Sequence, residues 1–247
     1  MPFTTSHIIA AIGIHKVAPR LSLSALAIGT MSPDFEYLLR LKPMSSVSHT
    51  AAGSFLFCVP AGLVVWALHG AILQPALSGR VLGEHPHAAK LDCGLRNVLL
   101  VAVAVWIGAL THIVWDGFTH AGGFALDWFP VLRSPVWTDP DIPLFKILQH
   151  GSSLAGAVGI GVWVWRRHRS LLLEWITSPK ALRAIVRMLF VGGLVAMVGG
   201  LLNGFLSLRG EASFQPGRFV VGCMDAVFLL ALLDGILFRW RRLRRRP

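Results

Sequence analysis

The stretch VLLVAVAVWIGAL (residues 98–110), followed directly by THIVWDGFTH (residues 111–120), decides how this sequence folds. The first part is apolar and uncharged, whereas the second places His112, Asp116 and His120 four residues apart. We expect one transmembrane helix over residues 98–116, because crossing a bilayer takes about 20 mainly apolar residues. The helix then ends in two imidazoles and a carboxylate. Ionisable groups at membrane depth are costly and usually serve a function.

The composition extends this interpretation to the whole chain. Of its 247 residues, 54% are hydrophobic and 14% are charged, whereas about a quarter of a soluble domain is charged. The net charge of +11 is concentrated in residues 166–187 and 239–246, which adjoin apolar runs. Cytoplasmic segments of membrane proteins carry such clusters. We therefore expect membrane lipids as partners and no nucleic acid. We also expect no cleavable signal peptide, because no basic segment precedes the first apolar stretch.

The apolar runs predict an all-α integral membrane helical bundle with about five transmembrane helices. The expected spans are residues 53–73, 98–116, 152–165, 189–208 and 219–238. Residues 21–31 are too short to span and predict a re-entrant or interfacial helix, or a buried one, near the N-terminus. We treat residues 1–247 as a single membrane-embedded domain. Within it, residues 1–155 form the metal-site half, 156–238 the packing helices and 239–247 a basic cytoplasmic tail.

Small residues and charge predict how the helices are packed and oriented. Small side chains recur every four residues in the fourth run, at Gly192, Ala196, Gly200 and Gly204, a pattern that lets two helices approach closely. It serves either packing within the chain or a homo-oligomer. The basic clusters place the C-terminus in the cytoplasm and residues 117–150 outside. The basic residues of the first 50 positions argue for the opposite orientation.

The number of crossings brings distant polar residues to one face of the membrane. If residues 53–73 and 98–116 both span, the chain crosses twice between Ser48 and Gly117. His49 then lies on the same side as His112 and Asp116, whichever way the protein inserts. The other polar residues expected on that side are His7, Asp34, Glu36, His120 and His150.

The spacing of these residues favours a metal site over a merely polar helix end. His112 and Asp116 are about 6 Å apart on a helix and can bind one ion together. His120 would lie about 12 Å from His112 on a continuous helix. It joins the same ion only if Gly117 breaks the helix, and otherwise serves a second ion. Mixed imidazole and carboxylate ligands suit zinc best.

Five blocks of the sequence carry a resemblance to known proteins. They are MPFTTSH, MSPDFEYLLRL, SHTAAGSFLFCVP, LTHIVWDGFTHAGG and LQHGSSLAG, all within about the first 155 residues. They resemble an uncharacterised bacterial family of small multispan membrane proteins. That family is distantly similar to inner-membrane proteins predicted to be metal-dependent hydrolases, and to the zinc-dependent phospholipase C and P1 nuclease group. The chain departs from the hydrolase pattern in one respect, because no Arg follows His49.

The resemblance implies a divalent metal, zinc above all, and a location in the bacterial inner membrane. It implies His7, Asp34, His49, His112 and Asp116 as metal ligands, with His120 as a sixth. We expect a hydrolase that acts on a phosphoester or phospholipid-like substrate at the extracytoplasmic membrane face. Asp34 or Glu36 would be its general base, and His120 or His150 would assist the leaving group.

Two other functions remain open at this stage. The same ligands are compatible with a metal-binding transport protein, for which Asp225 in the last span is the supporting residue. They are also compatible with a non-catalytic structural membrane protein.

Overall fold

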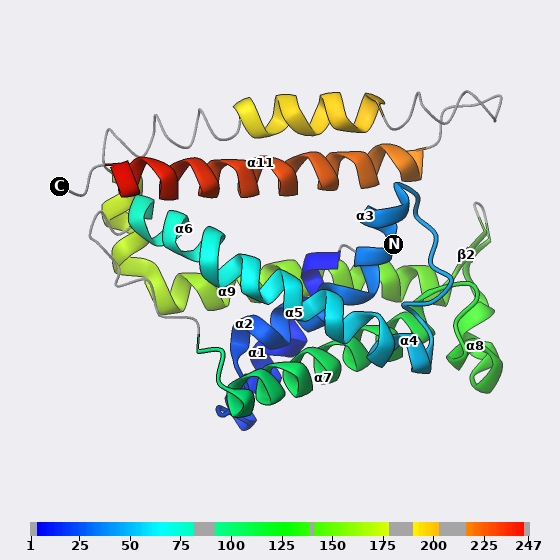
Figure 1. The fold of residues 1–247 in the computed structure, drawn as a ribbon. Coiled ribbons are helices and arrows are strands. Elements are labelled where there is room, and N and C mark those ends of the chain that lie inside the picture. The colour runs from blue at the N-terminus through cyan, green and yellow to red at the C-terminus, as the bar shows by residue number, and fades with distance from the viewer. Residues whose placement is uncertain (1–3, 82–91, 139–140, 178–189, 203–215, 245–247) are drawn as a thin grey trace. The chain divides into compact units, whose positions relative to one another are not determined.

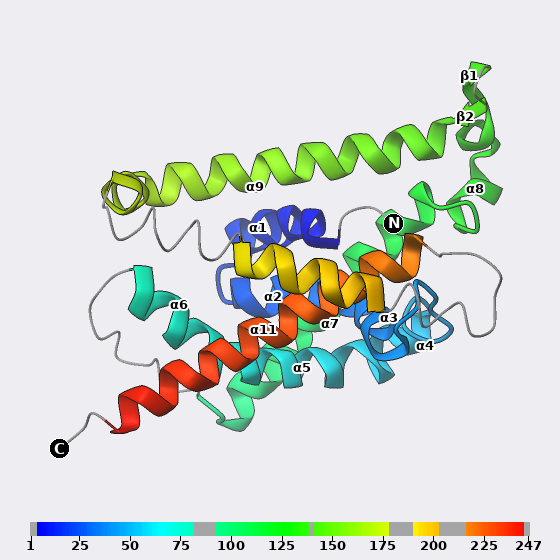
Figure 2. The same cartoon turned by 90° about the horizontal axis from the view of Figure 1, so that it is seen from above.

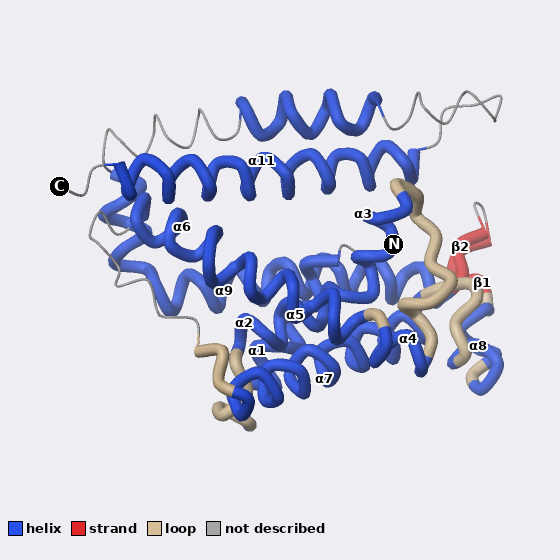
Figure 3. The backbone as a smooth tube through the Cα atoms, viewed as in Figure 1, coloured by secondary structure: helices blue, strands red, loops and turns tan. Residues whose placement is uncertain are grey.

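The computed structural model describes residues 4–81, 92–138, 141–177, 190–202 and 216–244 (Figure 1). Its helices are α1 (Ile8–Val17), α2 (Leu23–Met31), α3 (Phe35–Arg40), α4 (Ala51–Leu56), α5 (Cys58–Leu68), α6 (Gln74–Val81), α7 (Leu95–Thr119), α8 (Ala125–Trp128), α9 (Leu144–Thr177), Phe190–Leu202 and α11 (Pro216–Arg244). Short 3₁₀ turns cover Thr4–His7, Ser32–Asp34 and Pro130–Arg133, and a π-helical turn covers His69–Leu73. The all-helical membrane architecture expected from the sequence is confirmed (Figure 3).

Within the described residues, four helices are long and apolar enough to cross a membrane. They cover Ala51–Leu77, Leu95–Thr119, Leu144–Ser170 and Pro216–Arg242. Each contains one of the predicted spans. The fifth predicted span, residues 189–208, overlaps the shorter apolar helix Phe190–Leu202, and its remaining residues lie outside the described part of the chain. The chain is therefore a multi-pass membrane protein.

Two compact units make up the chain. Unit 1 consists of Met1–Phe35, Ser46–Trp66 and Cys93–Arg167, and unit 2 of Glu36–Ser45, Ala67–Asp92 and His168–Pro247. Their boundary inside α9 falls at His168, whose backbone angles (φ −130°, ψ 18°) are not helical. Each unit is described by itself below.

The centre of unit 1 is the crossing of α2 and α7, which pack along each other. A Cβ atom on Gly29 would lie 2.3 Å from the carbonyl oxygen of Val105, and one on Gly108 would lie 2.5 Å from that of Leu26. Only glycine allows two backbones to approach so closely. Small and apolar side chains fill the rest of this core: Ala11, Ala25, Leu26, Val101, Ala104 and Val105.

Local signals in the sequence set the ends of the elements around this core. The side chain of Ser22 accepts a hydrogen bond from the Ala25 amide and caps α2. The 3₁₀ turn Ser32–Asp34 follows α2 directly, with Pro33 at its start. Thr50 caps α4 by accepting a hydrogen bond from the Gly53 amide at 2.9 Å. These turns fix the backbone around Asp34 and His49.

Unit 2 also relies on close contacts at glycine. The helix Phe190–Leu202 approaches α11 at Gly199, where a Cβ atom would lie 2.4 Å from the Cβ atom of Ala226. At Gly200 it would lie 2.6 Å from Cys223 Sγ. The small-residue pattern thus serves packing within the chain at Gly200, whereas a Cβ atom on Gly192 would have no neighbour within 4 Å. Its use in a homo-oligomer stays a prediction.

One feature absent from the sequence-based expectation is a small antiparallel hairpin. Strands β1 (Pro135–Thr138) and β2 (Asp141–Pro143) pair between α8 and α9 (Figure 3). They are too short to give a clear alternating pattern, so apolar periodicity does not reveal them.

Candidate metal centre

The last turns of α7 supply the first two residues of the centre. His112 and Asp116 lie one turn apart on the same face, with His112 Nε2 3.2 Å from Asp116 Oδ2. Both residues are buried, and His112 is only 1% exposed. A polar pair this deeply buried is costly unless its atoms find partners.

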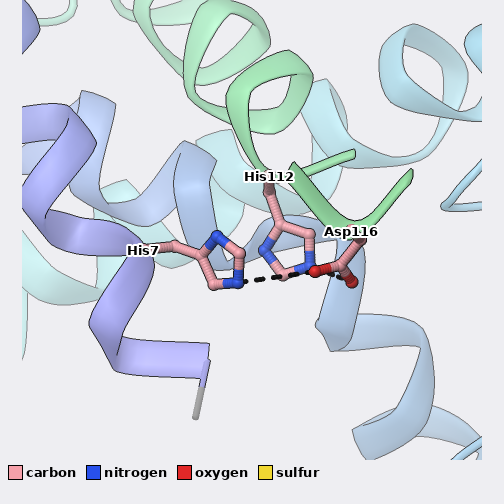
Figure 4. A group of neighbouring side chains, drawn as sticks. All are labelled: His7, His112 and Asp116. Carbon is pink, nitrogen blue, oxygen red and sulfur yellow. Dashed lines mark ion pairs between the residues drawn. The ribbon is translucent and has the colours of Figure 1, made fainter. Parts of the chain in front are cut away.

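His7 reaches the pair from the other end of the sequence. It ends the 3₁₀ turn Thr4–His7, and its ring stacks on the His112 ring with 4.0 Å between the centroids. Its Nε2 lies 3.6 Å from Asp116 Oδ1. Figure 4 shows the three side chains pointing toward one another. The chain is held here by Ser6, whose hydroxyl donates to the carbonyl of Ser153 in α9.

Asp34 and His49 complete the centre from two loops. His49 Nε2 lies 3.6 Å from Asp34 Oδ1 and 3.6 Å from Asp116 Oδ2. His112 Nε2 also lies 3.6 Å from Asp34 Oδ1. The other Asp34 oxygen, Oδ2, accepts a hydrogen bond from the Thr4 hydroxyl. Three imidazoles and two carboxylates therefore converge, as the number of membrane crossings predicts. We call these five residues the metal cluster.

The metal cluster has the dimensions that an ion requires. In each of two groups, His7–His112–Asp116 and Asp34–His49–His112, the ligand atoms lie within 4.8 Å of one another. Ligand atoms about 2.1 Å from a tetrahedral ion are roughly 3.4 Å apart, close to the separations of 3.2 to 3.6 Å found here. Among the described residues, buried His7 Nε2, His112 Nε2 and Asp116 Oδ1 make no hydrogen bond. These side chains fit a divalent cation.

The hydrogen bond on its other ring nitrogen orients His112. Its Nδ1 lies 2.7 Å from the carbonyl oxygen of Thr30 and donates to it. In a neutral ring the Nε2 atom then carries the lone pair, and this atom faces the carboxylates, as in metal sites where a backbone carbonyl holds the ligating ring. Thr30 belongs to α2 and follows Gly29, so the glycine crossing of α2 and α7 sets this contact.

His7 is in the protonation state that metal binding needs. Burial, reinforced by the neighbouring His112, lowers the pKa of His7 to about 3. Its imidazole is therefore neutral at physiological pH, and only a neutral imidazole offers its nitrogen to a metal.

His120 lies at the edge of the metal cluster, one third of its side chain exposed. Of the two alternatives left open for His120, the helix break at Gly117 is not found, because α7 continues to Thr119 and His120 itself turns the chain (φ −123°, ψ 147°). Gly117 instead makes room for the ring of Phe124. His120 Nδ1 lies 3.6 Å from Asp116 Oδ1, and burial lowers the pKa of His120.

Gln149 is a residue of the site that sequence reasoning missed. It is buried in α9, and its side-chain amide lies 3.1 Å from His120 Nε2 and donates to it. The block LQHGSSLAG contains both Gln149 and His150, and the sequence analysis selected His150 because its imidazole can transfer protons. His150 is exposed in the structure.

Glu36 has a different environment from the other candidates. It belongs to unit 2, where its buried carboxylate pairs with Arg40, with Arg40 Nη2 2.7 Å from Oε1. Its role as a general base stays a prediction.

The family described as a domain of unknown function (DUF4184) matches residues 1–236, and the chain belongs to this family. No curated protein and no solved structure matches the chain.

Proposed function

We propose that the protein is a membrane-bound metal-dependent hydrolase that acts on a phosphoester or phospholipid-like substrate at the membrane face. One observation carries the proposal: three imidazoles and two carboxylates from four separate segments meet at the end of a membrane span. The resemblance to zinc-dependent phospholipases and to predicted membrane hydrolases supplies the reaction class.

The five residues of the metal cluster would hold the ion, and a mixed nitrogen and oxygen set favours zinc. Such an ion supplies Lewis acidity, which makes water a nucleophile near neutral pH and stabilises charge on a phosphoryl oxygen. Asp116 faces the other residues with both oxygens, Oδ1 toward His7 and Oδ2 toward His49 and His112. We therefore expect it to be the ligand whose loss weakens binding most.

His120 is the group that we assign to proton transfer. It lies beside Asp116 yet is 33% exposed, whereas His112 is 1% exposed, so a substrate at the membrane face reaches it more readily. Its ring is held on both sides, by the Asp116 backbone carbonyl at Nδ1 and by the Gln149 amide at Nε2. Proton transfer to the leaving group would require His120 Nε2 to exchange its hydrogen bond with the Gln149 amide for one with the substrate, while the Asp116 carbonyl keeps the ring in place.

The test is release of headgroups from a panel of phospholipids and lipid-linked phosphates by zinc-loaded protein. The His120→Gln variant should keep its metal and lose activity by about 10² to 10⁴-fold, the usual contribution of acid–base catalysis. The matched control is His15→Gln, because His15 lies in the same unit with its ring bonded to the Leu21 carbonyl. Metal-loaded wild-type protein that cleaves none of these substrates would refute the hydrolase proposal.

Metal transport is the second candidate function. It is favoured by Asp225 in α11, because Asp225 Oδ2 is buried and makes no hydrogen bond within the described part of the chain. A carboxylate in a membrane span commonly marks an ion pathway. Zinc flux into proteoliposomes that is lost in Asp225→Asn, with no hydrolysis by the wild type, would support transport instead.

The orientation of the site is part of the proposal. The basic residues 166–187 and 239–246 support a cytoplasmic C-terminus and an extracytoplasmic metal cluster in the bacterial inner membrane. A reporter fused after Pro247 should be active only in the cytoplasm, and activity outside would reverse the orientation.

A further inference from the structure

Large apolar side chains are exposed in the segment that joins α7 to α9. Six of them lie within residues 124–137, and we call them the aromatic platform: Phe124, Trp128, Phe129, Val131, Val136 and Trp137. Trp128 is 72% exposed and Trp137 is 64% exposed. Scattered apolar residues on a surface are ordinary, but a set this dense usually marks a contact surface.

The platform belongs to a folded segment. A small core of Ala125, Leu126, Leu132 and Phe145 lies beneath it. Phe118 of α7 stacks on Phe129 and meets the edge of Phe124. The segment is therefore attached to the end of α7, one turn or less from Asp116. In both views α8 and the hairpin lie at the start of α9 (Figures 1 and 2).

The order of the spans places the platform at the membrane surface. Residues 120–143 connect the candidate spans Leu95–Thr119 and Leu144–Ser170, so both ends of the segment lie at the membrane face where the metal cluster lies. Large side chains are also exposed near the adjoining ends of both spans, Trp115 in α7 and Ile147 in α9. In a membrane protein, exposed apolar side chains at the ends of two spans have lipid as their neighbour.

The segment also carries an exposed ion pair. Asp127 pairs with Arg133, with Oδ1 and Nη2 2.6 Å apart, and both side chains are more than half exposed. Arg133 also donates to the Leu126 carbonyl. A segment that carries both exposed aromatic side chains and an exposed ion pair suits the boundary between lipid and water.

We propose that the aromatic platform inserts into the headgroup region of the bilayer and holds the metal cluster at the depth of lipid phosphates. The occupant of this surface is the surrounding membrane lipid. Combined with the proposed hydrolase function, on which this step rests, the substrate is a lipid that stays in the bilayer while its headgroup is cleaved.

Spin labels test the insertion without any reference to metal or activity. Single cysteines replace Trp128, Trp137 or Asp127 in a full-length Cys93→Ser, Cys223→Ala background, in which the remaining Cys58 is buried. In proteoliposomes, labels at 128 and 137 should collide more with oxygen, which concentrates in lipid, than with a water-soluble nickel chelate. The neighbouring label at 127 should show the reverse order.

Three results would overturn the insertion. If labels at 128 and 137 collide with the nickel chelate as often as the label at 127, the aromatic platform lies in water. Low access of both reagents would mean that protein covers it, either another part of this chain or a partner. Low access of both reagents that rises at one chain per vesicle would identify a second copy as the occupant.

A hydrolysis assay tests the substrate. The Trp128→Ser/Trp137→Ser variant should cleave a bilayer lipid at least about 100-fold more slowly, because losing the burial of each large apolar side chain corresponds to about tenfold or more and the variant loses two. It should cleave a water-soluble phosphoester of the same headgroup at the wild-type rate. An equal loss on both substrates, or none on either, would overturn the lipid assignment. Absence of hydrolysis in the wild type refutes the proposed function and leaves the spin-label result to decide insertion.

Discussion

Units 1 and 2 pack their helices by the same means but enclose different interiors. Both bring backbones together at glycine, Gly29 and Gly108 in unit 1 and Gly199 and Gly200 in unit 2. The unit 1 crossing leads directly to buried Thr30, Asp34, His112 and Asp116, whereas the described partners of Gly199 and Gly200 are Ala226, Gly222, Cys223 and Phe219. Close helix packing is therefore general in this chain. What distinguishes unit 1 is that the packing brings buried imidazole and carboxylate groups together.

The largest effect should come from adding a side chain at the unit 1 crossing. Gly108→Val forces a Cβ atom into the backbone of α2 and should destabilise unit 1 by about 3 kcal/mol or more, with loss of bound metal. The control is Gly161→Val in α9, where a Cβ atom has no neighbour within 4 Å. Thermal unfolding and metal content measure both variants, and a stable, metal-loaded Gly108→Val would contradict the described crossing.

The equivalent change in unit 2 should separate packing from metal binding. Gly199→Val places a Cβ atom against Ala226 and should cost about 1–3 kcal/mol of stability, while the zinc affinity of folded protein stays at the wild-type value. Gly192→Val, which meets no neighbour within 4 Å, should leave both unchanged. Reduced zinc affinity in Gly199→Val would show that the metal cluster depends on unit 2.

Removing the amide that holds His120 should affect activity alone. Gln149→Leu keeps the volume and deletes the hydrogen bond to His120 Nε2, so hydrolysis should fall about 10 to 100-fold, the usual effect of losing a residue that orients a ligand or its neighbour. Metal content should not change. Gln74→Leu, at an exposed site in unit 2, serves as the control, and equal activities of the two variants would remove Gln149 from the site.

The smallest effect is expected at the helix cap beside His49. Thr50→Ala removes the acceptor of the Gly53 amide hydrogen bond and should cost about 1 kcal/mol, with slightly weaker zinc binding. Thr50→Ser retains the hydroxyl and should behave as wild type. If Thr50→Ala equals Thr50→Ser in stability and zinc affinity, the cap does not position His49.

Apolar run length was sufficient to predict the four spans that the structure describes, and the number of crossings placed the polar residues on one membrane face. The resemblance to known families selected five of those residues as ligands. Four predicted spans lie within described helices, because bilayer thickness sets their length and dominates any local preference. Counting membrane crossings requires no knowledge of packing, which is why His7, Asp34 and His49 could be placed on the same membrane face as His112 from the sequence alone. Their role as ligands remains a prediction.

The contacts that orient the cluster could not be predicted in the same way. The Thr30 carbonyl that holds His112 is a backbone group and leaves no residue-specific signal. Gln149 acts through a tertiary contact, and its neighbour His150 gave the stronger chemical signal. A helix break at Gly117 was one alternative from the sequence, but glycine also occurs where an aromatic ring packs closely, here Phe124.

Metal analysis of purified protein tests the central claim most directly. Wild-type protein and the His15→Ala control should each retain zinc after gel filtration, while His112→Ala and Asp116→Asn should bind it at least about 100-fold more weakly. Both variants must remain folded by circular dichroism for the comparison to hold. Wild-type protein without metal, or folded His112→Ala and Asp116→Asn variants with the wild-type zinc content, would contradict the metal centre.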